Sequence, residues 1–208
     1  PKIEVMVPLA VPAPRGNPSQ AELEHVRRKY ALPEHFILMI GTVEPRHNHQ
    51  AVFAALADAA SPAGVVVCGR RTAWSDYLLG YARARRIAAR VDFIYELTPS
   101  DLPALFRLAR VFAYLPDADA EASVVPVVEA LRAGLPMVLS DTQVNREAAG
   151  EAAAYVRPEA RGEVLAALEN ALEDVSWRRT MQERERRRAE LFSEYAVAER
   201  LMQIYTSL

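Results

Sequence analysis

Six short apolar runs recur along the chain, and a segment with helical spacing of apolar residues follows each of them. The runs cover residues 36–41, 65–69, 91–95, 111–115, 137–140 and 153–156. Because they are continuous and not alternating, the pattern predicts strands that are covered on both faces. With helices between the strands, we expect an open, doubly wound, parallel α/β sheet with right-handed crossovers.

The two ends of the chain depart from this pattern. Residues 8–18 contain four prolines with Gly16 and Asn17, a composition that resists helix and strand, so residues 1–18 are expected to form a linker. Residues 19–30 then predict a short polar helix with Ser19 as its N-cap, and Leu23 and Val26 on its inner face. Residues 160–172, 177–190 and 195–205 predict consecutive helices without strands.

Composition and charge limit the possible partners. The chain has 25 Lys and Arg against 27 Asp and Glu, a net charge of -2, which gives no reason to expect nucleic acid. Its apolar runs are far shorter than the ~20 residues of a membrane helix. Cys68 is the only cysteine, which excludes an intrachain disulfide and favours a reducing compartment such as the cytoplasm. The four arginines at 184 and 186–188 lie among glutamates and are interpreted as a solvated helix face with ion pairs four residues apart.

Ligands of doubly wound sheets bind beyond the carboxyl ends of the strands, which directs attention to three loops. The first follows the strand at 36–40 and has the sequence GTVEPRHN. Gly41 allows a sharp turn, and Arg46 near a helix start is suited to pair with a phosphate. The plainer interpretation is that Asn48 caps the next helix and Arg46 is a surface charge, and the local sequence alone favours it.

The second loop runs from residue 115 into a helix that is expected to start between Ser123 and Pro126 and to end at Gly134. This places Glu121 before the helix and Glu129 about one turn inside it. Carboxylates there accept hydrogen bonds from sugar hydroxyls, while the first N–H groups of the helix hold a diphosphate. Two glutamates that merely face water are an equally good interpretation of the spacing.

The third loop, Gly69 to Arg71, is either a phosphate clamp or a turn with two exposed arginines. His47 and His49 have no further clustered ligands in the sequence, so we expect no metal site. Cys68 is expected to be a small core residue at a strand end. No G-x-G-x-x-G follows any strand, which argues against dinucleotide oxidoreduction.

Taken in order, these segments resemble the C-terminal domain of the retaining glycosyltransferases of family 4, the group 1 family with the GT-B fold. GTVEPRHN at 41–48 is similar to the family's GTxEPRKN, and VVVCG at 65–69 and DLPALFRLA at 101–109 follow. Glu121 and Glu129 have the spacing of its E-x7-E pattern, and EALRAGLPMVLSD at 129–141 and EAAGEAAAYVRP at 147–158 complete the likeness. It covers nearly the whole chain, and the order and spacing of the motifs make it specific.

The resemblance implies a Rossmann-like donor-binding domain at 19–190, which binds a nucleotide-diphosphate sugar and transfers a hexose with retention to an unknown acceptor in polysaccharide biosynthesis. By position, Glu121 would contact the donor sugar, Glu129 the ribose and Arg46 the diphosphate, with no metal or other cofactor. The further donor-contacting residues that it implies are Gly41, Thr42, His47, Gly69, Arg70, Ser123, Val124 and Val125.

The resemblance also implies an N-terminal acceptor-binding domain that this chain lacks, so the isolated chain would be inactive. Residues 1–18 would be the interdomain connection, residues 191–208 would form a helix that packs towards the missing half, and any peripheral membrane association would come through that half. Three departures keep other functions open: His47 replaces a lysine, Glu121-Ala122-Ser123-Val124 replaces EGFG, and there is an extra residue between Pro116 and Glu121. The alternatives are a degenerate, non-catalytic domain and a nucleotide-sugar epimerase on a related fold.

Overall fold

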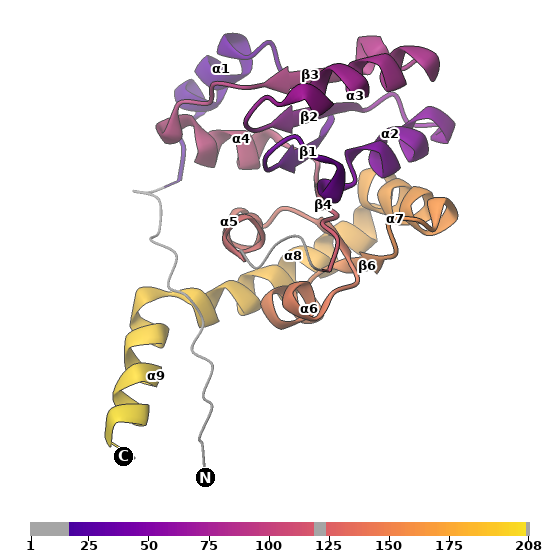
Figure 1. Cartoon of the computed structure of the whole chain (residues 1–208). Coiled ribbons are helices and arrows are strands. Elements are labelled where there is room, and N and C mark those ends of the chain that lie inside the picture. The colour runs from indigo at the N-terminus through magenta and orange to yellow at the C-terminus, as the bar shows by residue number, and fades with distance from the viewer. Residues whose placement is uncertain (1–16, 119–123, 207–208) are drawn as a thin grey trace.

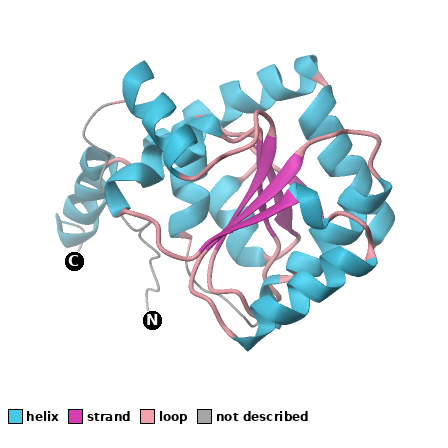
Figure 2. Ribbon diagram, turned by 90° about the horizontal axis from the view of Figure 1, so that it is seen from above, coloured by secondary structure: helices cyan, strands magenta, loops and turns pink. Residues whose placement is uncertain are grey.

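The computed structural model describes residues 17–118 and 124–206 and confirms the doubly wound α/β architecture (Figure 1). All strand pairs are parallel, and the sheet order is β3-β2-β1-β4-β5-β6. Figure 2 shows the twisted sheet with helices on both of its faces. The strands are β1 (Phe36–Ile40), β2 (Gly64–Cys68), β3 (Val91–Ile94), β4 (Val111–Tyr114), β5 (Met137–Ser140) and β6 (Ala154–Val156).

Two apolar cores lie on opposite faces of the sheet, because successive side chains of a strand point to opposite sides. In β1, Phe36 and Leu38 enter one core while Ile37 and Met39 enter the other. The first core is closed by α1 (Gln20–Lys29), α4 (Leu102–Leu108), α5 (Val125–Ala133) and α6 (Gln143–Ala149). The second is closed by α2 (His49–Asp58), α3 (Ala73–Ala84) and α7 (Arg161–Glu173). Burial on both faces explains why the strands are uniformly apolar.

Short 3-10 turns complete the connections: η1 (Pro45–His47), η2 (Ala88–Arg90), η3 (Pro99–Asp101) and η4 (Glu190–Phe192). The helix predicted at 19–30 forms as α1, and Ser19 caps it in a capping box with Glu22. Leu23 and Val26 of this helix contact the first core, as predicted. Cys68 is buried at the end of β2, also as predicted, and burial raises the pKa of its thiol to about 11.

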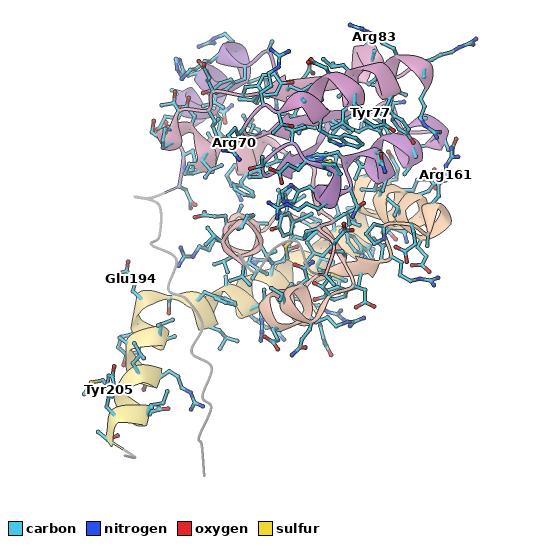
Figure 3. All side chains as sticks on the ribbon, in the orientation of Figure 1. Arg70, Tyr77, Arg83, Arg161, Glu194 and Tyr205 are labelled. Carbon is cyan, nitrogen blue, oxygen red and sulfur yellow. The ribbon has the colours of Figure 1, made fainter. Side chains whose placement is uncertain are left out.

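The tail is helical, as predicted, and consists of α7, α8 (Val175–Ala189) and α9 (Glu194–Thr206). α9 projects from the body, and Figure 3 shows its ends at Glu194 and Tyr205. Tyr195, Met202 and Tyr205 leave an exposed apolar surface along it. Within residues 17–118 and 124–206, no helix is long and apolar enough to cross a membrane.

The prediction for the arginines of α8 was right in one part and wrong in the other: Arg184, Arg186 and Arg187 are exposed, as expected for a solvated helix face, but the expected ion pairs are not formed among the residues described. Instead, Arg184 donates to the carbonyl of Glu151 at 3.1 Å. Arg188 donates to the carbonyls of Ala148, at 2.9 Å, and Glu147. These carbonyls lie at the C-terminal end of α6, where cations satisfy acceptors that the helix leaves unpaired. Two arginines therefore attach α8 to α6.

Glu185 of α8 is fully buried, and neither of its carboxylate oxygens has a hydrogen-bond partner among the described residues. Burial raises the pKa of this carboxyl to about 8, although the positive charge of Arg186 acts to lower it. A buried carboxyl without partners is stable only in its neutral form, because ionisation would place an unsolvated charge in the core. The carboxyl is therefore protonated in the folded protein at neutral pH.

We expect Glu185→Met to raise the free energy of unfolding at pH 8 by about 4 kcal/mol. The unfolded carboxyl loses its proton near pH 4.5, whereas the folded one keeps it to about pH 8, so rising pH destabilises the natural protein across that window. Urea unfolding at pH 4.5, 6 and 8 should show a difference that grows with pH. Glu183→Met, on the exposed side of the same helix, should have little effect at any of these pH values, and a constant difference for Glu185→Met would contradict the assignment.

Candidate functional site

A topological switch lies between β1 and β4, which are neighbours in the sheet. α2, which follows β1, buries Val52 and Phe53 in one core, whereas α5, which follows β4, buries Val127 and Leu131 in the other. The two connections therefore leave the carboxyl edge of the sheet in opposite directions. Ligands of this architecture bind where such connections diverge. This is where the first two loops of interest start.

Gly41 and Gly69 bring the loops after β1 and β2 into backbone contact. Gly41 has φ +143°, which favours glycine, and its N–H donates to the carbonyl of Cys68 at 3.0 Å. A Cβ atom at Gly69 would lie 1.8 Å from the carbonyl oxygen of Gly41. Thr72 closes the same contact, since its hydroxyl donates to the carbonyl of Val43. Gly69 is thus required by the close packing of the two loops, and Gly41 by its backbone conformation.

Glu44 forms ion pairs with both arginines that were predicted to bind phosphate, Arg46 and Arg70. Its carboxylate accepts from Arg46 Nε at 2.7 Å and lies 3.9 Å from an Nη of Arg70. Arg70 is labelled in Figure 3. Arg71 points elsewhere: it pairs with Asp76 at 2.9 Å and lies over the ring of Tyr95. The sequence prediction did not include Glu44, although it is part of the motif.

Asn48 joins the loop after β1 to the loop after β4. It adopts a left-handed conformation before α2, but its side chain makes no capping bond to that helix, contrary to the simpler interpretation of the sequence. Its amide instead donates to the carbonyl of Leu115 at 2.9 Å and to the carboxylate of Asp117 at 2.6 Å. The N–H of Asp117 in turn donates to the carbonyl of Arg46 at 2.8 Å. Arg46 is therefore held beside the segment that leads to Glu121.

His47 is buried within the first loop, and its ring lies about 3.6 Å from the position of a Cβ on Gly41. Its Nδ1 lies 2.5 Å from the carbonyl oxygen of Thr42. His49 is also buried, which lowers the pKa of its imidazole to about 4 and keeps it neutral. The two rings meet edge to face. In residues 17–118 and 124–206, no three His, Cys, Asp or Glu side chains gather where they could hold a metal ion.

The second loop leads into α5, which begins at Val125 after Val124 as its N-cap. This start lies within the predicted range between Ser123 and Pro126, while Ser123 and Glu121 themselves lie outside the described residues. Val124 provides no side-chain cap, and Pro126 lies in the first turn, so the first N–H groups of α5 need partners from outside the helix. The helix ends at Gly134 in a left-handed conformation, as predicted.

Glu129 lies about 6 Å along α5 from its first residue. It is half-buried in a small cleft between α4 and α5, whose wall also includes Pro18, Arg107 and Arg132. Burial raises the pKa of Glu129, and the nearby charge of Arg132 opposes that rise. The structure thus brings Gly41, Arg46 and Gly69 together in the loops after β1 and β2. Glu129 lies on the other side of the switch, between α4 and α5.

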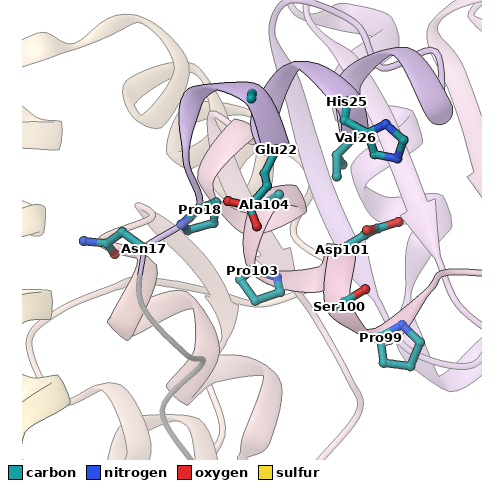
Figure 4. A pocket seen from close by; sticks show the side chains of 11 residues that line it. Asn17, Pro18, Glu22, His25, Val26, Pro99, Ser100, Asp101, Pro103 and Ala104 are labelled. Atoms are coloured by element: carbon teal, nitrogen blue, oxygen red, sulfur yellow. The ribbon is translucent and has the colours of Figure 1, made fainter.

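A groove of about 590 Å³ lies between α1 and the start of α4 (Figure 4). Its described walls contain none of the predicted donor-contacting residues. Its carboxylates already serve the packing of α1: Glu22 belongs to the cap of that helix, and Asp101 binds Lys29 at 2.7 Å and Tyr30 at 2.9 Å. This groove therefore belongs to the α1–α4 interface and not to the candidate site.

Residues 22–188 match the family model described as glycosyl transferases group 1. The chain belongs to this family. It is 29% identical over 181 residues to the O-antigen chain mannosyltransferase B of Escherichia coli. The aligned region covers 84% of the chain and 47% of the mannosyltransferase. The group 1 domain thus spans about half the length of this relative.

Solved glycosyltransferase structures share the fold of this chain. The chain superimposes with a TM-score of 0.78 on Anabaena HepE in complex with UDP and glucose, at 16% identity over 92% of the chain and 54% of HepE. It also superimposes with a TM-score of 0.78 on WaaG, a glycosyltransferase involved in lipopolysaccharide biosynthesis, at 19% identity over 95% of the chain and 55% of WaaG. At these identities the likeness shows a shared fold.

We expect Gly69→Ala to destabilise the domain by about 3 kcal/mol or to displace the loop of Gly41, because an added methyl group would overlap backbone atoms. Gly80→Ala is the matched control: Gly80 lies inside α3 with open space around it, so alanine should stabilise the helix by about 0.5 to 1 kcal/mol. Urea unfolding of both variants measures the effect. Equal stability of Gly69→Ala and the natural protein would show that the contact between the loops is not required.

Proposed function

We propose that this chain is the donor-binding half of a retaining glycosyltransferase, which binds a nucleotide-diphosphate sugar and transfers a hexose to an acceptor held by another domain. The observation that carries this proposal is the switch-point arrangement, in which Arg46 is fixed by Glu44 and Asn48 beside the segment that leads into α5. The UDP of the HepE complex and the glycan-related activities named for the relatives support a sugar-nucleotide ligand and a role in polysaccharide biosynthesis.

The diphosphate would lie between Arg46, Arg70 and the start of α5. The guanidinium of Arg46 is suited to bidentate phosphate binding, and the first N–H groups of α5 supply partial positive charge. These donors would stabilise the charge that develops on the diphosphate when the glycosidic bond breaks. We propose that they make a metal ion unnecessary for this step. His47 would act by supporting Gly41 and Thr42, since its ring is buried beneath them.

The two glutamates would bind the rest of the donor. Glu129 would accept hydrogen bonds from the ribose hydroxyls in its half-buried position, and Glu121 would contact the transferred sugar. The acceptor would be bound by an N-terminal domain against which α9 packs, with residues 1–18 as the connection. The exposed apolar side chains of α9 support this arrangement, because a monomeric surface seldom exposes such a row. We propose a cytoplasmic location, in agreement with the single, buried cysteine.

Isothermal titration of this chain with UDP, GDP and ADP and their sugars tests donor binding. We expect one of them to bind, and Arg46→Ala to weaken that binding by about 10- to 100-fold, because a charged hydrogen bond to the diphosphate is lost. Arg71→Ala should leave affinity unchanged, since Arg71 is directed to Asp76 and Tyr95. Absence of binding at millimolar ligand, or equal losses in both variants, would count against the proposal.

A second candidate function is that of a degenerate domain kept for interaction. The buried position of His47 favours it, because this side chain stands where the family has a lysine, and its burial leaves little of it available to a diphosphate. Such a domain would retain the fold and the exposed surface of α9 without transferring sugar.

Transfer by a protein that joins this chain to an acceptor-binding half distinguishes the two functions. We expect transfer with retention of the anomeric configuration, read by NMR of the product, and a loss of about 100-fold or more in kcat/KM for Glu129→Ala and Glu121→Ala. Glu147→Ala, on the exposed side of α6, is the control. An inverted product would overturn the retaining mechanism, and persistent inactivity with bound nucleotide would favour the degenerate domain.

A further inference from the structure

Arg132 connects the helix that bears Glu129 to the start of α9. It lies three residues after Glu129 on α5, and its Nη2 donates to the carbonyl of Phe192 at 3.1 Å. Phe192 is buried at the end of η4, and Ser193 directly after it accepts a hydrogen bond from the N–H of Ala196 in the first turn of α9. Arg132 thus adds a direct hydrogen bond to the apolar packing that places Phe192 in the same core as α5.

The same guanidinium faces the cleft of Glu129. Arg132 and Glu129 line it together with Pro18, the end of the segment that joins this domain to the preceding residues. The Nη1 of Arg132 is buried and has no hydrogen-bond partner among the described residues. Because buried donors are almost always paired, this one is suited to a carboxylate or ligand oxygen that enters the cleft.

Other charged groups around Glu129 are committed to different partners. Arg107 of α4 lines the cleft but donates to the carbonyl of Ala133 at 2.9 Å. On α6, Arg146 pairs with Asp141, and on α8, Arg188 donates to carbonyls of α6. Glu185 of α8 is neutral at pH 7, because its pKa is raised to about 8. Arg132 is thus the cation whose charge acts on the Glu129 carboxyl, which burial would otherwise keep protonated to higher pH.

We propose that Arg132 is a positioning residue for donor binding: its charge favours the ionised form of the Glu129 carboxyl across the cleft that both line, and its bond to Phe192 links their helix to the start of α9. The proposal rests on the proposed function, in which Glu129 binds the ribose. Packing of α9 against another domain would then stabilise the donor-binding arrangement of α5. Pro18 lines the same cleft as Arg132, and Phe192 accepts a hydrogen bond from Arg132, so both connections towards that domain lie near this side chain.

The test is the affinity of the chain for UDP and GDP, measured by isothermal titration between pH 4.5 and pH 8 in the natural protein and in Arg132→Met, Arg132→Lys and Glu129→Gln. Glu129→Gln reports the pH dependence that comes from the phosphates themselves. In the natural protein, affinity should fall more steeply at low pH than it does in Glu129→Gln, because protonation of the Glu129 carboxylate removes an acceptor for the ribose hydroxyls. Arg132→Met should move this fall to higher pH and lower the affinity at pH 5 about fivefold more than at pH 8.

Arg132→Lys retains the charge and should keep the pH profile, but it should lose much of the bond to Phe192. Amide exchange at residues 193–197 should therefore be faster in both Arg132 variants than in the natural protein. An unchanged pH profile in Arg132→Met, or the same shift when the variant is combined with Glu129→Gln, would overturn the role of Arg132. Failure of the natural chain to bind UDP or GDP would instead overturn the proposed function, and this inference with it.

Discussion

The amide of Asn48 holds together the part of the molecule on which the candidate site depends. The strands β1 and β4 lie side by side, but the helices after them leave to opposite faces of the sheet, which would allow their loops to separate. Asn48 prevents this by donating to the carbonyl of Leu115 and the carboxylate of Asp117. The backbone N–H of Asp117 in turn donates to the carbonyl of Arg46. The left-handed conformation that this geometry requires is one that asparagine tolerates better than most residues.

Buried polar groups extend the same support to the neighbouring strand. The hydroxyl of Ser140 at the end of β5 donates to the carbonyl of Pro116, and the amide of Asn145 donates to that hydroxyl. Both side chains are buried, where a hydrogen bond is costly to leave unmade. The segment at residues 115–117 is thus fixed from two sides, by Asn48 and by Ser140. Its path depends on three strands at once.

Electrostatics in the site follow from the same packing. Glu44 keeps Arg46 and Arg70 on one side of the switch, and Arg132 acts on Glu129 on the α4–α5 side. The tail contributes through contacts that its composition does not suggest: the arginines of α8 satisfy carbonyls at the end of α6, and Phe192 accepts from α5. The helical tail is therefore part of the support for α5, the helix that bears Glu129.

The sequence by itself determined the class of the fold and the family. Apolar runs mark strands buried on both faces, Ser19 marks the start of α1, and Gly134 marks the end of α5, because each depends on local conformation or on burial along one segment. It also predicted the loops that meet at the switch. Only the tertiary structure decided that Asn48 crosses to the next loop instead of capping α2, that Val124 precedes α5, that Glu185 is buried and that Arg132 reaches Phe192. These contacts depend on which groups compete for the same donor or the same space, and the groups involved lie up to 69 positions apart in the sequence.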